Sequence, residues 1–476
     1  MSNADALDRM FNASSIAVIG ASSEAGKVGH SVVKNLVDGG FRGRIYPVNP
    51  TRAPAGGGSA SGGGDELFGC PYYARLADIP GPVDTAVIVI PAAAVNDAIA
   101  ACGEKGVATA VIITSGYAEM GNVDLQADLV ETARRAGVRV LGPNIFGFYY
   151  PHNDLCATFC TPYTKRGGVA FTCQSGGVGM AVIGFTRSKG IGVSAIVGLG
   201  NKVDIAEHDL LAFFGRDPNT RVVAMHMEDL KDGPAFVAAA REVSRRKPVI
   251  AFKTGRTPLG SRAAASHTGA LAGVDRIYDA AFRKAGVLRA RTLDELLDWA
   301  RALAVLPPPQ GPNVFVHTSA GGLGVAIADA MFDQGLQAME VPSDLEEALR
   351  KYIPPFGSFR NPVDVTGSST PDVQAETARL AIEDPRMHSV ILGYWHTIIT
   401  PPMVYAEAIG RVVEEARAKG VVKPIVASLS GDVEVEEAAR YLDERGIPSY
   451  PYAPERAVLA LAALHRWSRA AGRLGE

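Results

Sequence analysis

The sequence predicts an α/β protein built from doubly wound parallel sheets. Short apolar segments, such as residues 15–20, 85–90 and 109–114, alternate with helical patterns. This alternation is typical of parallel strands whose two sheet faces are both covered by helices. The same succession restarts near residue 167 and again near residue 314. Because 476 residues exceed one ordinary domain of roughly 100 to 200 residues, we predict three such domains.

Breaks in composition place the expected boundaries. We predict a first domain over residues 1–145, a second over 146–303 and a third over 312–460. Residues 303–313 contain clustered prolines, which neither continue a helix nor pair within a sheet, and are predicted to be a linker. Residues 54–65 are rich in Gly and Ser, so we expect a surface loop there.

Charge and hydropathy exclude two classes of partner. The chain has 47 Lys and Arg against 50 Asp and Glu, a formal net charge of -3, so no global basic field attracts nucleic acid or anionic lipid. No uninterrupted apolar run approaches the roughly 20 residues that span a bilayer. We therefore expect neither a nucleic-acid nor a membrane partner.

The cysteines indicate a reducing compartment. Their odd number, five, their scatter and the lack of a signal-like start argue against a disulfide framework, and we expect a cytoplasmic protein. His152, Cys156 and Cys160 recur every four residues, which on a helix would align possible metal ligands. Pro151 favours a loop or extended segment instead, and no second ligand pair of zinc-finger spacing follows, so we expect no metal site.

Three turns could bind phosphate groups. Each βα series opens with a strand, a run of small residues and a helix, at residues 17–29, 170–180 and 315–325. A helix N-terminus offers free backbone N–H groups and a partial positive charge, and small residues let a phosphate approach. One such turn is equally well explained by close packing at glycine, whereas three favour a phosphate-bearing ligand.

The first turn does not fit NAD. It has Gly20, Gly26 and Gly29 where a strict G-x-G-x-x-G would be expected. The next strand ends in residues 47–50, Pro-Val-Asn-Pro, without the acidic residue that binds the ribose hydroxyls of NAD. We predict a different nucleotide-bearing ligand.

Two titratable residues stand out. Glu228 follows an apolar run, at the carboxyl edge of a parallel sheet, where it could orient an imidazole; the alternative is a solvated loop acid. His267 stands among Ala, Gly and small hydroxyl residues, without the larger apolar neighbours that bury a core histidine. We expect the segment that carries His267 to move.

These motifs together resemble a known family. "SHTGALAG" (266–273), "CQSGG" (173–177) and "GASSEAGKVG" (20–29), with "PVNP", "SGYAE" and "GPN", resemble the acyl-CoA synthetases that form a nucleoside diphosphate, relatives of succinyl-CoA synthetase. The order of the motifs is similar to that of the alpha subunit of ADP-forming acetyl-CoA synthetases. The resemblance implies a CoA-binding Rossmann-like domain followed by two flavodoxin-like domains.

The resemblance also implies roles for single residues. His267 would carry a phosphoryl group, Glu228 would orient it, and two opposing helix N-termini would hold its phosphate. The residues of these two phosphate sites are Ser175, Gly176 and Gly177, and Gly321 and Gly322. The implied CoA-binding residues are Gly20, Ala21, Ser22, Ser23, Lys27, Gly29, Val48, Asn49, Pro50, Pro91, Ser115, Glu119 and Asn144.

The implied activity is an acid–CoA ligase that interconverts acyl-CoA, ADP and phosphate with acid, CoA and ATP. The third domain leaves no room for an ATP-grasp domain, so the resemblance implies an ATP-grasp beta subunit that binds ATP or ADP with magnesium, with two copies of each chain. An aryl-CoA synthetase or an ATP-driven CoA-adding lyase of the same superfamily would use the same residues. A CoA-sensing subunit without turnover is the alternative from another class.

The sequence departs from the family in three places. Asp229 follows Glu228 where glycine is common, and its charge should weaken phosphate binding unless the side chain points away. Ile145 stands where a cysteine is common, which leaves the acyl group open. The Gly-rich stretch after "VNP" is longer than usual.

Overall fold

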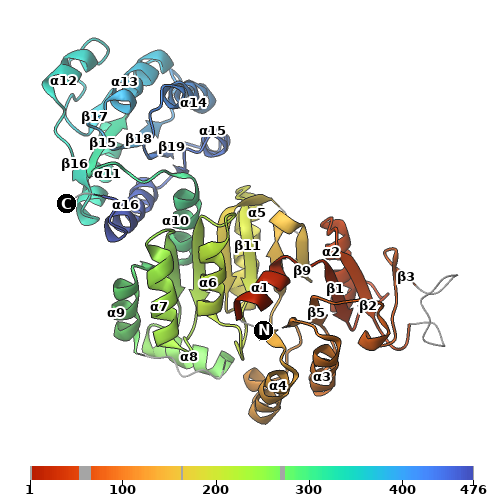
Figure 1. Cartoon of the computed structure of the whole chain (residues 1–476). Coiled ribbons are helices and arrows are strands. Elements are labelled where there is room, and N and C mark those ends of the chain that lie inside the picture. Colours follow the sequence, from red (N-terminus) through yellow and green to blue (C-terminus); the bar gives the residue numbers. More distant parts are fainter. Residues whose placement is uncertain (1–2, 53–65, 162–164, 269–273, 475–476) are drawn as a thin grey trace. The chain divides into compact units, whose positions relative to one another are not determined.

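The computed structural model describes residues 3–52, 66–161, 165–268 and 274–474, without the side chains of residues 3–4 and 264–268. The expected loop at 54–65 lies outside these residues. The chain divides into two compact units, residues 1–291 and 292–476 (Figure 1). The boundaries of three separate domains stay a prediction. Among the described helices, none combines the length and the apolar character needed to cross a membrane.

The first unit opens with the predicted parallel sheet. Within the described residues its strand order is β2-β1-β5-β6-β7, and every neighbouring pair is parallel. The strands are β1 (Ser15–Ile19), β2 (Arg44–Val48), β5 (Thr85–Ile88), β6 (Thr109–Ile112) and β7 (Arg139–Leu141). The other elements of this part are α1 (Asn3–Phe11), α2 (Val28–Asp38), α3 (Val95–Lys105), α4 (Val123–Ala136), the short hairpin β3 (Glu66–Leu67) and β4 (Cys70–Pro71), and the 3-10 turns η1 (Leu76–Asp78), η2 (Ala92–Ala94) and η3 (Ala118–Met120).

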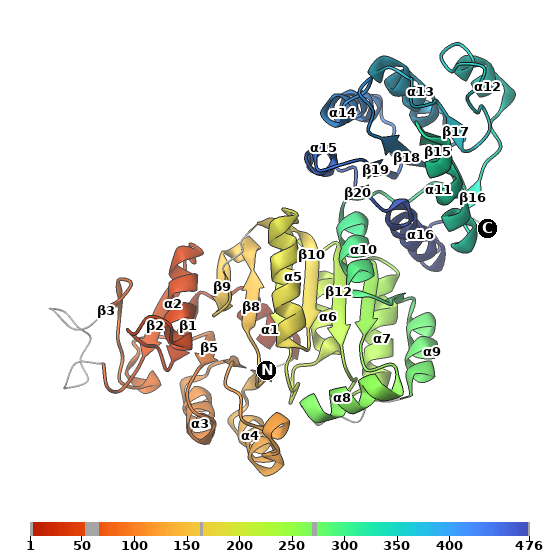
Figure 2. The same ribbon diagram turned by 180° about the vertical axis from the view of Figure 1, so that it is seen from behind.

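The second sheet combines a parallel core with an antiparallel edge. Its order in the described residues is β14-β13-β12-β10-β11-β8-β9, in which β8 and β9 form an antiparallel hairpin. Helix α5 covers one face, and α6 and α7 cover the other (Figures 1 and 2). The strands are β8 (Gly147–Tyr150), β9 (Leu155–Thr158), β10 (Arg166–Cys173), β11 (Val193–Gly198), β12 (Val222–Met227), β13 (Val249–Lys253) and β14 (Leu288–Ala290). The helices are α5 (Gly176–Ser188), α6 (Glu207–Arg216), α7 (Gly233–Ser244), α8 (Pro258–Thr268), α9 (Asp275–Ala285) and the 3-10 turn η4 (Pro151–Asn153).

The two sheets of the first unit share one hydrophobic core. Phe11 of α1 stacks on Phe213 of α6 with ring centroids 4.3 Å apart and meets Phe148 of β8 edge-on at 5.6 Å. All three rings belong to one cluster of buried residues, which also includes Val18 of β1 in the first sheet and Met225 of β12 in the second. This continuity explains why residues 1–291 form one compact unit.

The β8–β9 hairpin contains the three possible metal ligands of the sequence. His152 lies in the 3-10 turn η4, Cys156 in β9 and Cys160 two residues after β9, so the three side chains do not align on one α-helix. A ring nitrogen of His152, Nε2, lies 3.0 Å from the carbonyl oxygen of Gly167.

The second unit is another α/β sandwich. In the described residues its order is β16-β15-β18-β19-β20, with β17 paired to β15, and all pairs are parallel. The strands are β15 (Asn313–Thr318), β16 (Gln337–Ala338), β17 (Val363–Asp364), β18 (Ser389–Trp395), β19 (Ile425–Ser430) and β20 (Ser449–Pro451). The helices are α10 (Leu293–Val305), α11 (Gly321–Asp333), α12 (Ser343–Leu349), α13 (Pro371–Glu383), α14 (Pro402–Ala418), α15 (Glu434–Glu444) and α16 (Pro454–Ala470).

Helix α10, which spans the predicted boundary at residue 303, falls in the second compact unit. Arg301 of α10 pairs with Asp443 at 2.6 Å, and Asp298 pairs with Arg456 of α16 at 2.7 Å. Charge pairs with one partner largely buried hold their geometry better than exposed ones. They fix α10 against α16.

Acid should destabilise the second unit before its carboxylates titrate. Burial lowers the pKa of His317 and of His465 to about 4, whereas an unfolded histidine titrates near 6.5. Because the unfolded state then binds more protons, the stability is complete above pH ~6.5 and is lost as the pH falls towards about 4, at up to ~1.4 kcal/mol per pH unit for each histidine. All three tryptophans lie in this unit, so urea unfolding followed by tryptophan fluorescence measures it. His465→Gln should flatten the slope; a wild-type midpoint that does not change between pH 6.5 and 4.5 would contradict the prediction.

Candidate functional site

The first turn packs tightly at its glycines. Gly20 has φ +95°, and its N–H donates to the carbonyl of Val48 at 3.0 Å. A Cβ on Gly29 would lie 2.1 Å from the oxygen of Gly20, so no larger residue fits there. The two glycines thus seat the start of α2 against the end of β1, while Ser23 and Lys27 are exposed.

Asn49 holds the end of β2 to this turn. Its side-chain amide donates to the carbonyl of Ala21 at 2.8 Å, and its Oδ1 accepts the backbone N–H of Thr51 at 3.0 Å. Pro50 beside it is exposed, and Val48 is buried. Asn49 therefore fixes the loop at the position where an NAD-binding domain carries an acid.

Lys27 supplies a cation at the N-terminus of α2. It is the residue before Val28, its side chain is 60% exposed, and its Nζ lies 4.0 Å from a Glu24 carboxylate oxygen. An exposed pair at this distance contributes little, so the ammonium can contact an anionic ligand.

Glu119 stabilises the loop after β6. One carboxylate oxygen accepts the N–H groups of Gly116 at 2.6 Å and Tyr117 at 3.1 Å, and the other accepts Asn201 Nδ2 at 2.6 Å. Burial alone would raise the pKa of Glu119, but these hydrogen bonds outweigh it and hold the pKa below its ordinary value. The ionised side chain thereby connects the loop that contains Ser115 to Asn201.

The second turn leaves its glycines open. Ser175 is the N-cap of α5, and its N–H donates to His226 Nδ1 at 3.5 Å. A Cβ on Gly176 would meet no atom within 4 Å, and one on Gly177 would meet only Ser175 Oγ, at 3.8 Å. Protein packing does not require glycine at these two positions, so the start of α5 is open at both residues. Their N–H groups at the helix start fit a phosphate.

Glu228 lies just beyond β12 and is only 9% exposed. Its backbone N–H donates to Gln174 Oε1 at 2.7 Å. Gln174 directly precedes Ser175, so this bond places the glutamate beside the phosphate turn. A carboxylate this deeply placed is not a solvated loop acid.

A buried lysine, missed by the sequence analysis, organises this region. Lys202 Nζ lies within 2.9 Å of Gln174 Oε1, Glu207 Oε1 and the carbonyl oxygen of Asp229, and 2.7 Å from Asp229 Oδ1. Burial would lower the pKa of Lys202, but the attraction of the two carboxylates outweighs it and raises the pKa. Burial would raise the pKa of Asp229, but the neighbouring Lys202 outweighs it and lowers the pKa. The negative charge of Asp229 is therefore compensated within the protein.

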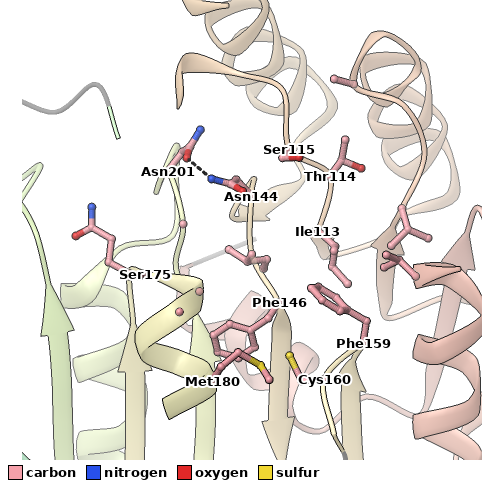
Figure 3. Close-up of a pocket in the computed structure, with 18 of the residues that line it drawn as sticks. Ile113, Thr114, Ser115, Asn144, Phe146, Phe159, Cys160, Ser175, Met180 and Asn201 are labelled. Atoms are coloured by element: carbon pink, nitrogen blue, oxygen red, sulfur yellow. Dashed lines mark hydrogen bonds between the residues drawn. The ribbon is translucent and has the colours of Figure 1, made fainter. Parts of the chain in front are cut away.

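One cavity of about 610 Å³ in the first unit brings several predicted residues together (Figure 3). Pro91, Ser115 and Asn144, which follow β5, β6 and β7, line it with Ser175 and Gly176–Gly177. Asn144, at φ +63°, donates from Nδ2 to Asn201 Oδ1 at 3.4 Å, and both side chains line the cavity. The other implied CoA residues and Glu228 are outside its lining.

The remaining predicted residues are placed as follows. Gly321 and Gly322 begin α11 in the second unit, where a Cβ on Gly321 would lie 3.0 Å from Asp364 Oδ2 and one on Gly322 would meet nothing within 4 Å. His267 lies in the last turn of α8, and its side chain is outside the described residues. The roles assigned to these residues stay predictions.

Fold and site define a class, the CoA ligases with a Rossmann-like CoA-binding domain. Family models match three successive stretches of the chain: a CoA binding domain at residues 14–151, a succinyl-CoA ligase like flavodoxin domain at 166–303 and a ligase-CoA domain at 314–475. The resemblance in the sequence is confirmed, and with it the fold class.

Individual relatives identify the family. The chain is 45% identical over 467 residues to the acetate–CoA ligase (ADP-forming) I subunit alpha of Pyrococcus furiosus, covering 97% of this chain and 98% of that one. It is 38% identical to the acetate–CoA ligase (ADP-forming) of Methanocaldococcus jannaschii, of which it spans 62%. A solved structure, the dinucleotide forming acetyl-coenzyme A synthetase 1 of Korarchaeum cryptofilum in complex with phosphate and ADP, matches with a TM-score of 0.92, 41% identity and 98% of both chains. The chain belongs to the ADP-forming acyl-CoA synthetase family.

Proposed function

We propose that the chain is the alpha subunit of an ADP-forming acid–CoA ligase that interconverts acyl-CoA, ADP and phosphate with acid, CoA and ATP. The observation that carries the proposal is the single cavity that is lined both by Ser115 and Asn144, implied to bind CoA, and by the open turn at Gly176–Gly177. A thioester and a phosphate bound at these two places would be neighbours.

The first step is attack of a phosphate oxygen on the thioester carbonyl carbon. The C–O bond forms, the C–S bond breaks, and the CoA thiolate takes up a proton, which leaves an acyl phosphate. Because the Ser175 N–H already donates to His226, the N–H groups of Gly176 and Gly177 are the donors left to hold the phosphate. Burial lowers the pKa of His226 to about 4, so its neutral ring keeps Nδ1 as an acceptor.

The second step transfers the phosphoryl group to His267. A ring nitrogen attacks phosphorus, the bond to the acyl oxygen breaks, and the acid leaves as a carboxylate. Glu228 would stabilise the charged ring, as carboxylates do for histidine. An oxygen of the terminal phosphate of ADP then attacks phosphorus, the P–N bond breaks, and ATP is formed.

The nucleotide would bind to a separate ATP-grasp beta subunit, which would also hold magnesium, in an assembly of two copies of each chain. The "subunit alpha" name of the Pyrococcus relative, which the chain matches over 98% of its length, supports a beta partner. The Korarchaeum complex with phosphate and ADP supports both ligands.

Calorimetry on the purified chain tests CoA binding. CoA should bind and NAD should not, and Lys27→Ala should weaken CoA binding by roughly ten- to a hundredfold, because one charge-assisted contact to phosphate contributes ~1.5–3 kcal/mol. Lys34→Ala is the matched control, since Lys34 is an exposed lysine of the same helix that pairs with Asp38. Tight binding of NAD without binding of CoA would refute the proposal.

A further inference from the structure

A second cavity of the first unit lies where strands begin, whereas the cavity described above follows the ends of β5, β6 and β7. It has a volume of about 530 Å³, and we call it the arginine pocket because Arg42 and Arg166 line it together with Asp154. Arg166 is the first residue of β10, and Ser175 follows the other end of that strand. The eight residues of β10 span roughly 25 Å, so the arginine pocket is separate from the phosphate turn.

The walls of the arginine pocket are fixed by hydrogen bonds and close packing. Asn153 donates from Nδ2 to Asn12 Oδ1 at 2.9 Å, and both side chains line the pocket. A Cβ on Gly43 would lie 2.3 Å from the ring of Phe41 and 2.5 Å from the carbonyl oxygen of Ser14. The loop between α2 and β2, which carries one of the two arginines, is therefore closely packed at its backbone.

Two cations share one carboxylate in this pocket. Arg166 donates from Nη2 to Asp154 Oδ1 at 2.7 Å and from Nε to the carbonyl oxygen of Pro151 at 3.1 Å. Arg42 Nε lies 3.8 Å from Asp154 Oδ2, beyond hydrogen-bond distance, and the Arg42 side chain is 90% exposed. Among the described residues that line the pocket, two guanidinium groups and one carboxylate leave a formal charge of +1, with His152 neutral. The pocket therefore attracts an anion, and the fork of N–H donors on Arg42 is available to hold it.

The chemistry of the pocket favours a phosphate group over a single carboxylate. A phosphate monoester carries a charge of about −1.5 to −2 at pH 7 and three acceptor oxygens, so it offers both guanidinium groups more negative charge than Asp154 does. The volume of the pocket is larger than a phosphate ion fills, and the half-buried ring of Phe41 provides apolar surface for the rest of a ligand.

We propose that the arginine pocket binds an organic phosphate, with the phosphate group between Arg42 and Arg166 and the organic part on Phe41. This site is additional to the phosphate turn at the start of α5. Its existence does not depend on the proposed ligase activity.

Calorimetric titration of the full chain with phenyl phosphate, an organic phosphate with an apolar part, tests the proposal. We expect saturable binding, at least tenfold tighter than that of phenylacetate, which carries a single negative charge. Arg42→Ala should weaken the binding of phenyl phosphate at least tenfold, because it removes a charge-assisted contact. Arg44→Ala is the matched control: Arg44 is also exposed, lies two residues further along the chain and does not line the pocket, so its loss should change the affinity less than about threefold.

A second variant should change the affinity in the opposite direction. Asp154 has φ +56°, a conformation that asparagine tolerates well, so Asp154→Asn should keep the fold and remove the carboxylate that competes with the ligand. We expect this variant to bind phenyl phosphate at least threefold more tightly than the wild-type chain does. Binding at the phosphate turn of α5 would respond to neither substitution.

Several results would overturn the inference. They are a wild-type chain that does not bind phenyl phosphate, equal effects of Arg42→Ala and Arg44→Ala, and unchanged or weaker binding by Asp154→Asn. Equal affinities for phenylacetate and phenyl phosphate would refute the assignment of a phosphate group to this pocket.

Discussion

Replacing His267 by asparagine is expected to abolish phosphoryl transfer. The wild-type chain, incubated with an acyl-CoA and radiolabelled phosphate, should acquire a label that is labile in acid and stable in base, as a phosphoramidate at an imidazole nitrogen is. Asparagine has no nucleophilic ring nitrogen, so label and ATP formation should both fall to background. ATP should appear only when an ATP-grasp subunit and ADP are added.

Two controls distinguish a loss of phosphoryl transfer in His267→Asn from a loss of folding. His267→Asn should still bind CoA, because His267 is not among the implied CoA residues, and His152→Asn should keep the label, because His152 lies in the β8–β9 hairpin against Gly167. Wild-type turnover in His267→Asn would show that the phosphohistidine mechanism is wrong. Substantial ATP formation by the wild-type chain alone would show that a nucleotide site lies within these residues.

Local signals in the sequence predicted the strands and their turns. Residues 389–395 form β18 and residues 15–19 form β1, because a short continuous apolar run favours a buried strand. The order of the strands within each sheet could not be predicted from these local signals. Pro91, Ser115 and Asn144 share an edge because β5, β6 and β7 are neighbours, which the doubly wound class permits but does not require.

The large apolar residues that line the cavity, among them Phe146 and Phe159, could not be predicted from periodicity. Phe146 and Phe159 flank an antiparallel hairpin added to a parallel sheet, and the sequence analysis expected parallel strands alone. Ile145 was noticed only as a departure from the family, and its place in the lining gives that departure a physical meaning.

The burial of Lys202 could not be predicted from the sequence either. A lysine is ordinarily exposed, and nothing in "GNKVD" marks this one as buried. Its partner Glu207 is a neighbour in the sequence, but Gln174 and Asp229 come from distant parts of the chain, so only the fold brings these two to the lysine. Asp229, whose charge was expected to oppose phosphate binding, is paired with this ammonium.

Replacing Lys202 by methionine should therefore strongly destabilise the first unit. It would remove the buried cation that Glu207 and Asp229 share, and breaking a buried pair in this way costs ~3–5 kcal/mol. Lys231→Met is the matched control: Lys231 pairs with the same Asp229 at 3.4 Å, but its side chain is 51% exposed, so its loss should cost about 1 kcal/mol or less. All three tryptophans lie in the second unit, so the change should be measured by amide hydrogen exchange at Glu228, whose N–H is held by Gln174.

The pH dependence distinguishes lost charge compensation from a simple packing defect. In the wild-type chain the lowered pKa of Asp229 adds stability that is present above an unfolded pKa of ~3.9 and is lost as the pH falls through the folded pKa. Without Lys202, burial should raise the pKa of Asp229, so the folded variant binds protons more readily than the unfolded chain and gains stability as the pH falls from 7 towards 5. The difference in stability between wild type and Lys202→Met should shrink over that range, and Asp229→Asn should partly rescue the variant at pH 7. The loss of stability in Lys202→Met could instead be independent of pH and unrelieved by Asp229→Asn. That result would mean that Lys202 contributes through packing alone and that another group compensates the charge of Asp229.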